Sequence, residues 1–233
     1  MNASEPDHDC PLCPRLAAFR NAQRRERPDW FNGPVPTFGA PQTARLLIVG
    51  LAPGLQGANR TGRPFTGDYA GDLLYETLLA FGFAQGRYEA RPDDGLRLVD
   101  CAIANAVRCV PPQNKPTPAE IKTCRPFLEA TRESAARLRV IVALGRIAHE
   151  SVVRALGGRL AAFPFGHGLE HDLGDVRLLD SYHCSRYNTN TGVLTPAMFR
   201  AVFKQARAIL DTERADDRHR LPVPPQGRRP RRI

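Results

Sequence analysis

The stretch GLAPGLQGANRTGRPFTGD, residues 50–68, joins the aliphatic run at 46–49 to a helical pattern that begins near Gly71. It contains five glycines, with Pro53 and Pro64 between them. Glycine permits backbone conformations that a Cβ forbids, so such a loop lets a ligand lie against bare peptide groups. A strand that leads into a glycine-rich loop and then a helix is typical of an α/β protein with a ligand site at that loop.

Two nucleotide-binding loops do not match this stretch. Gly57 and Gly62 give G-x-x-x-x-G, but Arg63 and Pro64 stand where a P-loop requires Lys and Ser or Thr. The dinucleotide motif G-x-G-x-x-G is absent, and no helix is expected to start inside the loop. A long irregular surface loop is the structural alternative, although glycine-rich connections of this length are uncommon unless they are functional or disordered.

The rest of the chain alternates between strand and helix patterns. We expect strands at 45–49, 96–107, 140–144 and 176–179, and helices at 14–27, 71–81, 117–138, 146–156 and 195–210. This alternation predicts one α/β domain over residues 1–212, with a central four-stranded parallel sheet and helices on both faces. Ligands of such sheets lie at the carboxyl ends of the strands, where Gly50, Asn105 and His183 fall.

Composition and charge limit the class of protein. The 233 residues are 42% hydrophobic, with a net charge of +9, and the pattern contains no membrane span or secretory signal. We therefore expect a cytoplasmic monomer. Residues 213–233 hold seven Arg against three acidic residues and are rich in Pro, so we expect a disordered basic tail. The positive charge favours either binding to a polyanion or solubility alone.

Four of the six cysteines form two pairs, which are Cys10 with Cys13 and Cys109 with Cys124. In a reducing compartment this pattern favours a metal site over disulfides. Four thiolates could hold Zn²⁺ or an iron-sulfur cluster, and spacing alone gives zinc the advantage. Cys101 lies in an apolar strand pattern and is expected in the core.

Three blocks of this sequence resemble motifs of the uracil-DNA glycosylase superfamily. The loop at 50–68 resembles motif 1 in its family 5 form, HCSRYNTNTG at 183–192 resembles motif 2, and NAVRCVPP at 105–112 resembles the middle block. These blocks and the four cysteines lie in the expected order along almost the whole chain. The resemblance implies an enzyme of base excision repair that flips uracil out of DNA and hydrolyses its N-glycosidic bond. Excision of hypoxanthine or other deaminated bases is left open.

The resemblance also implies a role for individual residues. It implies that the four paired cysteines hold a [4Fe-4S] cluster and not zinc. The ring of Phe65 stacks on the base, Asn105 reads its edge, and His183 donates a hydrogen bond to uracil O2. The expected site residues are Leu51, Ala52, Pro53, Gly54, Phe65, Asn105 and His183 for the base, and Ser185, Arg186, Asn188 and Asn190 for DNA.

The residue that activates water is less clearly marked. Related families place a carboxylate or amide where this chain has Leu51 and Ala52. Asp68 is the nearest carboxylate, and Asn59 is the other polar candidate. Two other functions stay open from the residues alone. One is a non-enzymatic DNA-binding module stapled by a metal, and the other is an α/β redox enzyme that uses a cluster for electron transfer.

Overall fold

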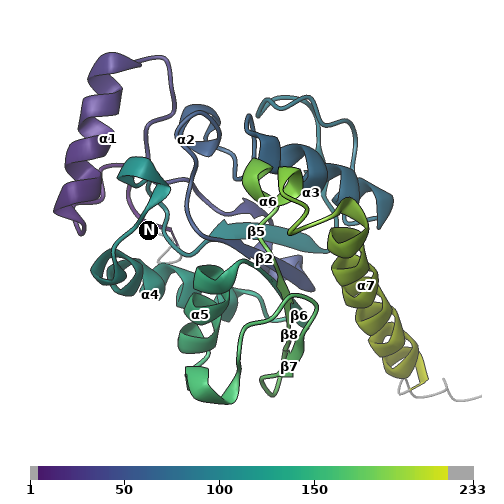
Figure 1. Ribbon diagram of the computed structural model, residues 1–233. Coiled ribbons are helices and arrows are strands. Elements are labelled where there is room, and N and C mark those ends of the chain that lie inside the picture. The colour runs from purple at the N-terminus through teal and green to yellow at the C-terminus, as the bar shows by residue number, and fades with distance from the viewer. Residues whose placement is uncertain (1–4, 220–233) are drawn as a thin grey trace, which may run out of the picture.

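The computed structural model describes residues 5–219, with side chains through residue 212, and its centre is a six-stranded sheet (Figure 1). The strand order is β1-β5-β2-β6-β8-β7. The strands are β1 (Phe38–Gly39), β2 (Leu46–Gly50), β5 (Cys101–Asn105), β6 (Val140–Leu144), β7 (Glu170–Asp172) and β8 (Arg177–Ser181). A separate hairpin pairs β3 (Ala84–Gln85) with β4 (Arg97–Leu98).

The four central strands are parallel, as the sequence predicts. Gly50 lies opposite Asn105 in the β2–β5 pair, and Val49 lies opposite Ala143 in the β2–β6 pair. The antiparallel edge strands β1 and β7 were not predicted, because two or three residues are too few to show a period of two. The single strand expected over 96–107 is wrong. It divides into β4 and β5, with Asp100 between them at φ +53°.

Helices cover both faces of the sheet (Figure 1). The main ones are α1 (Pro14–Glu26), α3 (Tyr69–Ala80), α4 (Pro118–Ser134), α5 (Arg146–Ala155) and α7 (Pro196–His219). Because side chains alternate along a strand, Leu46 and Ile48 of β2 join the core beneath α3 and α7. Leu47 and Val49 join the core beneath α4 and α5. Both faces of β2 are therefore buried, which explains its unbroken aliphatic sequence.

Several helix boundaries differ from the expectation. The helix expected over 117–138 ends at Ser134, and the capping box of Thr117 and Glu120 marks its start as predicted. The expectation that no helix starts inside the glycine loop is wrong, because α2 (Ala58–Thr61) lies there. A short helix α6 (Arg186–Asn190) occupies the motif 2 loop. The structure also has 3₁₀ turns at η1 (Pro41–Thr43), η2 (Pro112–Asn114) and η3 (Leu160–Ala162).

The expected tail begins inside a helix. Helix α7 continues to His219, seven residues into the expected tail, and residues 220–233 of that tail lie outside the described residues. Among residues 5–219, no helix is both long enough and apolar enough to cross a membrane.

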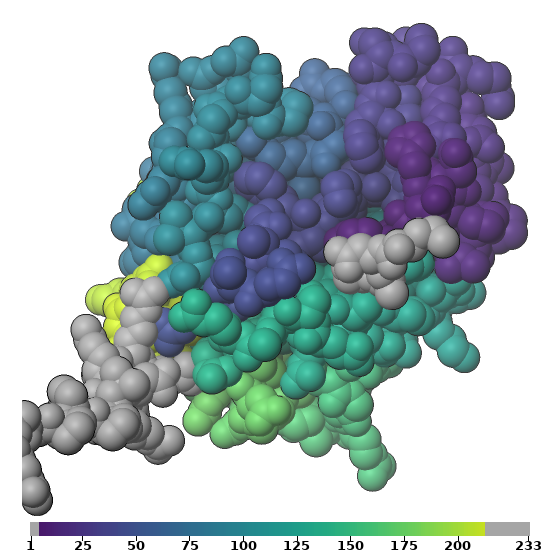
Figure 2. All heavy atoms as spheres, turned by 180° about the vertical axis from the view of Figure 1, so that it is seen from behind, coloured from purple at the N-terminus to yellow at the C-terminus, as the bar shows by residue number. Residues whose placement is uncertain are grey.

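The N-terminal segment packs against the middle of the chain. Leu16 of α1 forms a small buried cluster with Val107, Cys109 and Cys124. From behind, the purple N-terminal atoms lie beside teal atoms from this part of the chain (Figure 2). Sequence-distant cysteines thereby reach one side of the molecule.

Candidate active site

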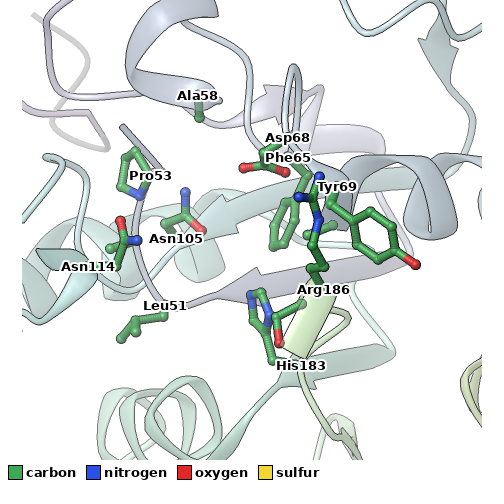
Figure 3. Close-up of a pocket in the computed structure, with 14 residues that line it drawn as sticks. Leu51, Pro53, Ala58, Phe65, Asp68, Tyr69, Asn105, Asn114, His183 and Arg186 are labelled. Carbon is green, nitrogen blue, oxygen red and sulfur yellow. The ribbon is translucent and has the colours of Figure 1, made fainter. Parts of the chain in front are cut away.

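A cavity of about 320 Å³ opens at the carboxyl ends of β2 and β5 (Figure 3). The glycine loop, the end of β5, the η2 turn and the start of α6 all contribute to it. Its lining residues are Leu51, Ala52, Pro53, Gly54, Ala58, Phe65, Asp68, Tyr69, Ala70, Asn105, Asn114, His183, Ser185 and Arg186. The three sequence blocks therefore meet at the edge of the sheet where the topology predicts a ligand.

Two of the lining side chains come together because residue 50 has no side chain. A Cβ at Gly50 would lie 2.5 Å from Asn105 Oδ1 and 2.6 Å from the Phe65 ring. Asn105 is only 2% exposed, and its Oδ1 accepts no hydrogen bond from the described residues. A buried acceptor without a partner is costly, so this oxygen is available to a ligand that brings a donor.

The backbone of Phe65 is held in an uncommon conformation. Its φ is +52°, which is in the left-handed region. The loop around it is fixed by Arg63, which donates two hydrogen bonds to Asp94 at 2.8 and 2.7 Å and one to Thr66 Oγ1 at 2.7 Å. Tyr75 also donates its hydroxyl to the Pro64 carbonyl at 2.6 Å. These contacts hold the Phe65 ring against the cavity despite the strain.

Asp68 is the residue before α3 and points into the cavity (Figure 3). A Cβ at Gly57 would lie 2.3 Å from Asp68 Oδ2, and one at Gly54 would lie 3.0 Å from it. Burial raises the pKa of Asp68 above its ordinary value, while the amides of Gly71 and Ala70 oppose that rise. Oδ1 is buried and accepts no hydrogen bond from the described chain, so the carboxylate can act on a water or a sugar.

His183 follows β8 and faces Phe65, with 6.0 Å between the ring centroids. Its burial lowers the pKa to about 4, so the imidazole is neutral at physiological pH. Asn188 Nδ2 donates to the His183 carbonyl at 2.8 Å and fixes the backbone there. A neutral imidazole has one N–H donor that it can offer to a developing anion.

Not all predicted site residues reach the cavity. Asn59 is fully buried away from it and donates Nδ2 to Asn32 Oδ1 at 2.9 Å. Asn188 lines a neighbouring hollow, and Asn190 is exposed on α6. Ser185 and Arg186 lie at the rim of the cavity, where the Ser185 hydroxyl caps α6. Asn59 therefore holds the glycine loop to the segment at residue 32, where no substrate in the cavity would touch it.

Sequence reasoning missed other lining residues. Tyr69 and Ala70 directly follow Asp68, so their place at the rim was available from the motif. The guanidinium of Arg186 lies 5.3 Å from the centroid of the Tyr69 ring. Asn114 comes from a proline-rich turn, and its sequence carried no signal that it would reach the cavity.

The four paired cysteines line a second, smaller hollow, and no disulfide joins them. They are Cys10, Cys13, Cys109 and Cys124. Two buried arginines stand beside them. Arg20 Nη1 lies 3.8 Å from Cys109 Sγ, and the Arg108 backbone N–H donates to Cys124 Sγ at 3.3 Å. Buried cations and N–H donors suit a group that carries negative thiolates.

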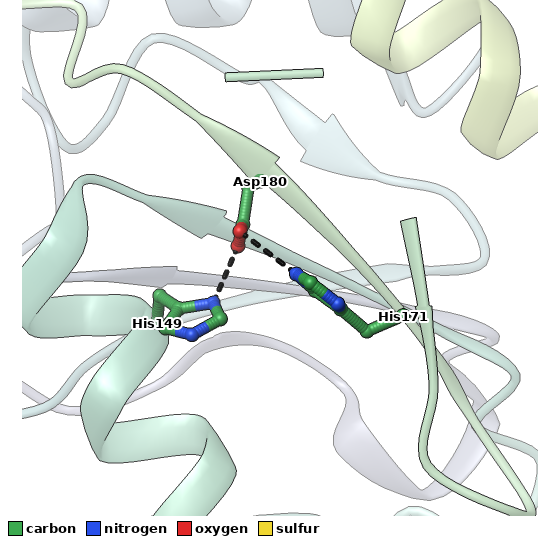
Figure 4. A group of neighbouring side chains, drawn as sticks. All are labelled: His149, His171 and Asp180. Atoms are coloured by element: carbon green, nitrogen blue, oxygen red, sulfur yellow. Dashed lines mark hydrogen bonds and ion pairs between the residues drawn. The ribbon is translucent and has the colours of Figure 1, made fainter. Parts of the chain in front are cut away.

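A buried histidine–aspartate group lies between α5, β7 and β8 (Figure 4). Asp180 Oδ1 is 2.7 Å from His149 Nδ1, and Oδ2 is 3.2 Å from His171 Nε2. His149 Nε2 is also 2.8 Å from the Phe163 carbonyl. Both ring nitrogens of His149 thus face oxygen acceptors, and a doubly protonated ring satisfies both. The group therefore joins α5, β7 and β8 as an ion pair rather than as a set of free metal ligands. The sequence analysis predicted a metal site only at the paired cysteines and did not identify His149 or His171.

Comparison with known proteins identifies a family and several relatives that are similar to this chain. A family model of the uracil DNA glycosylase superfamily matches residues 36–207. A type-5 uracil-DNA glycosylase of Thermus thermophilus is 47% identical over 207 residues, which cover 86% of this chain and 93% of the relative. A type-5 enzyme of Mycobacterium bovis is 44% identical over 214 residues, covering 88% and 79%. A type-4 enzyme of Archaeoglobus fulgidus is 38% identical over 119 residues, or 51% of each chain.

The parallel sheet, the cavity at its carboxyl edge and these matches define an α/β glycosylase, and the chain belongs to the uracil-DNA glycosylase superfamily. Within it the chain groups with the type-5 enzymes, whose similarity extends over most of its length. The family predicted from the sequence motifs is confirmed.

Proposed function

We propose that this chain excises uracil from DNA by hydrolysing the bond between the base and C1′ of its deoxyribose. One observation carries the proposal. Phe65 and Asp68 of the glycine loop, Asn105 at the end of β5 and His183 after β8 come from three separate segments and face the same cavity. An aromatic surface, a neutral amide, a carboxylate and a neutral imidazole are the groups needed to hold a flipped base and to remove it.

Recognition of the base is assigned to Phe65 and Asn105. A flipped pyrimidine would stack on the Phe65 ring, which the Arg63 contacts hold in place. The unpaired Oδ1 of Asn105 would accept the N3–H of uracil, while its Nδ2 would donate to O4. One amide thus matches both groups on this edge of uracil.

Chemistry is assigned to His183 and Asp68. As the bond between C1′ and N1 breaks, the electron pair leaves with uracil, and the neutral His183 would donate a hydrogen bond to O2 of that anion. The Asp68 carboxylate would stabilise the positive sugar and orient the water whose oxygen bonds to C1′. The water proton passes to the carboxylate or to solvent. Residues Leu51 and Ala52 supply no polar group, so this mechanism relies on early departure of the base.

The motif 2 loop is assigned to DNA. Arg186 at the cavity rim suits a phosphate. Tyr187 on α6 is 73% exposed, the most of any large hydrophobic side chain in the described residues. An exposed aromatic ring beside the cavity could fill the space in the duplex that the flipped base leaves. Ser185, Asn188 and Asn190 hold or extend this loop.

A [4Fe-4S] cluster is assigned to Cys10, Cys13, Cys109 and Cys124. The four thiols line one hollow beside the buried Arg20 and Arg108, whose positive charges suit a group that carries negative thiolates. When bound, the cluster would tie the N-terminal segment to α4.

The proposal is tested by excision from a duplex that carries one uracil, measured at single turnover with enzyme in excess. We expect wild type to release uracil, and His183→Ala to be slower by roughly 10²-fold, because one preorganised donor to a developing anion is lost. Asp175→Asn, an exposed residue at the end of β8 opposite His183, is the control. Release of hypoxanthine in parallel assays would define the base range. If wild type binds the duplex but releases no base, it is a binding module and the proposal fails.

A further inference from the structure

Asn32 joins helix α1 to the glycine loop. It lies in the segment between α1 and β1, which neither the three sequence blocks nor the proposed chemistry uses. Figure 1 shows this segment passing from the end of α1 beside α2. Asn32 is only 1% exposed, and its φ of +46° lies in the left-handed region, which asparagine adopts more readily than most residues. A buried amide needs partners at both of its ends, and Asn32 finds them on two different elements.

The first set of partners lies at the end of α1. Asn32 Nδ2 donates to the Arg27 carbonyl at 2.6 Å, and it also lies 3.3 Å from the Trp30 carbonyl. In the opposite direction, Arg24 Nε of α1 donates to the Asn32 carbonyl at 2.9 Å. Asn32 is thereby fixed to the C-terminal end of α1, the helix that begins directly after Cys13.

The second set of partners lies on α2, inside the glycine loop. The Asn32 backbone N–H donates to the Asn59 carbonyl at 3.0 Å, and Asn32 Oδ1 accepts from Asn59 Nδ2 at 2.9 Å. The Phe31 backbone N–H donates to the Arg60 carbonyl at 3.0 Å. Asn59 is 0% exposed, and its Oδ1 has no partner among the described residues. The Asn59 side chain therefore depends on Asn32 for its hydrogen bonding within the described chain.

The position of α2 determines where the Asp68 carboxylate lies. Gly57 directly precedes α2, and Asp68 Oδ2 lies 2.3 Å from the place that a Cβ at Gly57 would take. Ala58, the first residue of α2, lines the cavity. Arg60 Nη2 donates to the carbonyl of Gly67, the residue before Asp68, at 3.4 Å. A displacement of α2 would therefore move the wall against which the carboxylate packs.

We propose that Asn32 is a positioning residue for base excision. It holds α2 against the end of α1 and thereby fixes the Asp68 carboxylate in the cavity, although Asn32 itself lies outside the cavity lining. This inference rests on the proposed function, in which Asp68 stabilises the sugar and orients the water. Without the Asn32 side chain, the buried Asn59 amide has no partner among the described residues, so α2 moves toward solvent to hydrate it.

The test uses Asn32→Gly, because glycine keeps the left-handed backbone without strain and removes only the side-chain hydrogen bonds. Excision is measured at single turnover with saturating enzyme on a uracil duplex. Binding is measured by fluorescence anisotropy on a duplex that carries 2′-fluoro-2′-deoxyuridine, whose glycosidic bond resists hydrolysis. We expect excision about 10- to 100-fold slower, because a displacement of about 1 Å has an effect of that order, and binding as tight as that of wild type. Ala90→Gly, which makes the same backbone change at φ +57°, should alter neither.

Asn59→Ala removes the same hydrogen bond from its other end, and it carries the test if Asn32→Gly does not fold. It should slow excision to a similar extent, and the double variant should be little slower than either single variant. Additive losses would overturn the proposal. A lower unfolding midpoint in denaturant with a wild-type rate would also overturn it, because the bond would then serve the fold alone. Weaker duplex binding with a wild-type rate at saturation would assign Asn32 to DNA binding and overturn it as well.

Wild-type excision of uracil separates this inference from the proposed function. If wild type excises uracil and Asn32→Gly excises it at the same rate, only the inference about Asn32 fails. Absence of excision by wild type overturns both.

Discussion

Single glycines create the space in which the side chains of the proposed site lie. The Asp68 carboxylate occupies the volume that a side chain at Gly57 would fill, and Asn105 and Phe65 occupy the volume above Gly50. Neither glycine has a positive φ. These glycines are therefore needed because the lack of a side chain lets neighbouring side chains approach the backbone, and not because of backbone freedom.

Gly57→Ala should slow excision by displacing Asp68. The new Cβ would lie 2.3 Å from Asp68 Oδ2, so the carboxylate must move, and a shift of about 1 Å can cost roughly 10²-fold in rate. Single-turnover rates are compared for Gly57→Ala, Asp68→Ala and the double variant. If Gly57 acts through Asp68, the Gly57→Ala substitution should slow excision little further in the Asp68→Ala background. A full loss in that background would place its effect elsewhere.

At the level of the element, the glycine loop is organised by a buried ion pair that lies outside the cavity. The Arg63 and Asp94 side chains are 5% and 0% exposed. The Arg63 guanidinium also lies over the rings of Phe38, Tyr75 and Tyr88, at 5.2 to 5.8 Å from their centroids. The residue that excludes a P-loop in the sequence is therefore the one that holds Phe65 in its strained conformation.

Asp94→Asn should destabilise the fold and slow excision together. It leaves the Arg63 charge buried without a counter-charge, which typically costs about 3–5 kcal/mol. Denaturant unfolding measures the loss, and single-turnover excision measures the displacement of Phe65. Glu150→Gln breaks the exposed Glu150–Arg154 pair, 3.2 Å apart on α5, and should cost less than about 0.5 kcal/mol. Comparable losses in the two variants would mean that the buried pair does not organise the loop.

At the level of the whole molecule, two polar sites join segments that are distant in sequence. The cysteine site joins the N-terminal segment to β5 and α4, and the Asp180 group joins α5, β7 and β8. Both lie outside the cavity. These two sites position the walls of the cavity, because the N-terminal segment supports η2 and β8 leads to His183.

Protein purified without oxygen should be brown and hold about four irons per chain, since four thiolates suit a [4Fe-4S] cluster. Cys124→Ala should lose the colour and much of the soluble yield. Cys101→Ala is the matched control, because Cys101 is 2% exposed within the core and should leave the iron content unchanged. One zinc per chain with no iron would contradict the assignment.

The Asp180 group should make stability depend on pH. Burial opposes the charge on His149, but its hydrogen bond to Asp180 and the charge of that carboxylate raise the pKa of His149 above its ordinary value. The stabilisation is therefore complete below the unfolded pKa of about 6.5, and is lost as pH rises through the folded value. His149→Gln should cost about 3–5 kcal/mol at pH 6 and less at pH 9, measured by urea unfolding. A cost that grows with pH would exclude the charged pair.

The sequence by itself determined the family, the parallel core of the sheet and the edge at which the site lies. Alternating strands and helices leave one handedness of connection, and the carboxyl ends of parallel strands then meet at one edge. For that reason the strand pattern alone places Gly50, Asn105 and His183 together, although the roles assigned to them remain predictions.

Only the tertiary structure decided which side chains enter the cavity. Asn59 and Asp68 lie in the same motif, yet Asn59 turns inward to Asn32 while Asp68 faces the cavity. Asn114 reaches the cavity because Arg15 fixes a strained turn from 100 residues away. Side-chain direction in a loop depends on such long-range contacts, whereas strand and helix patterns depend on local periodicity. The local signal is present in the sequence, and the long-range contact exists only in the folded chain.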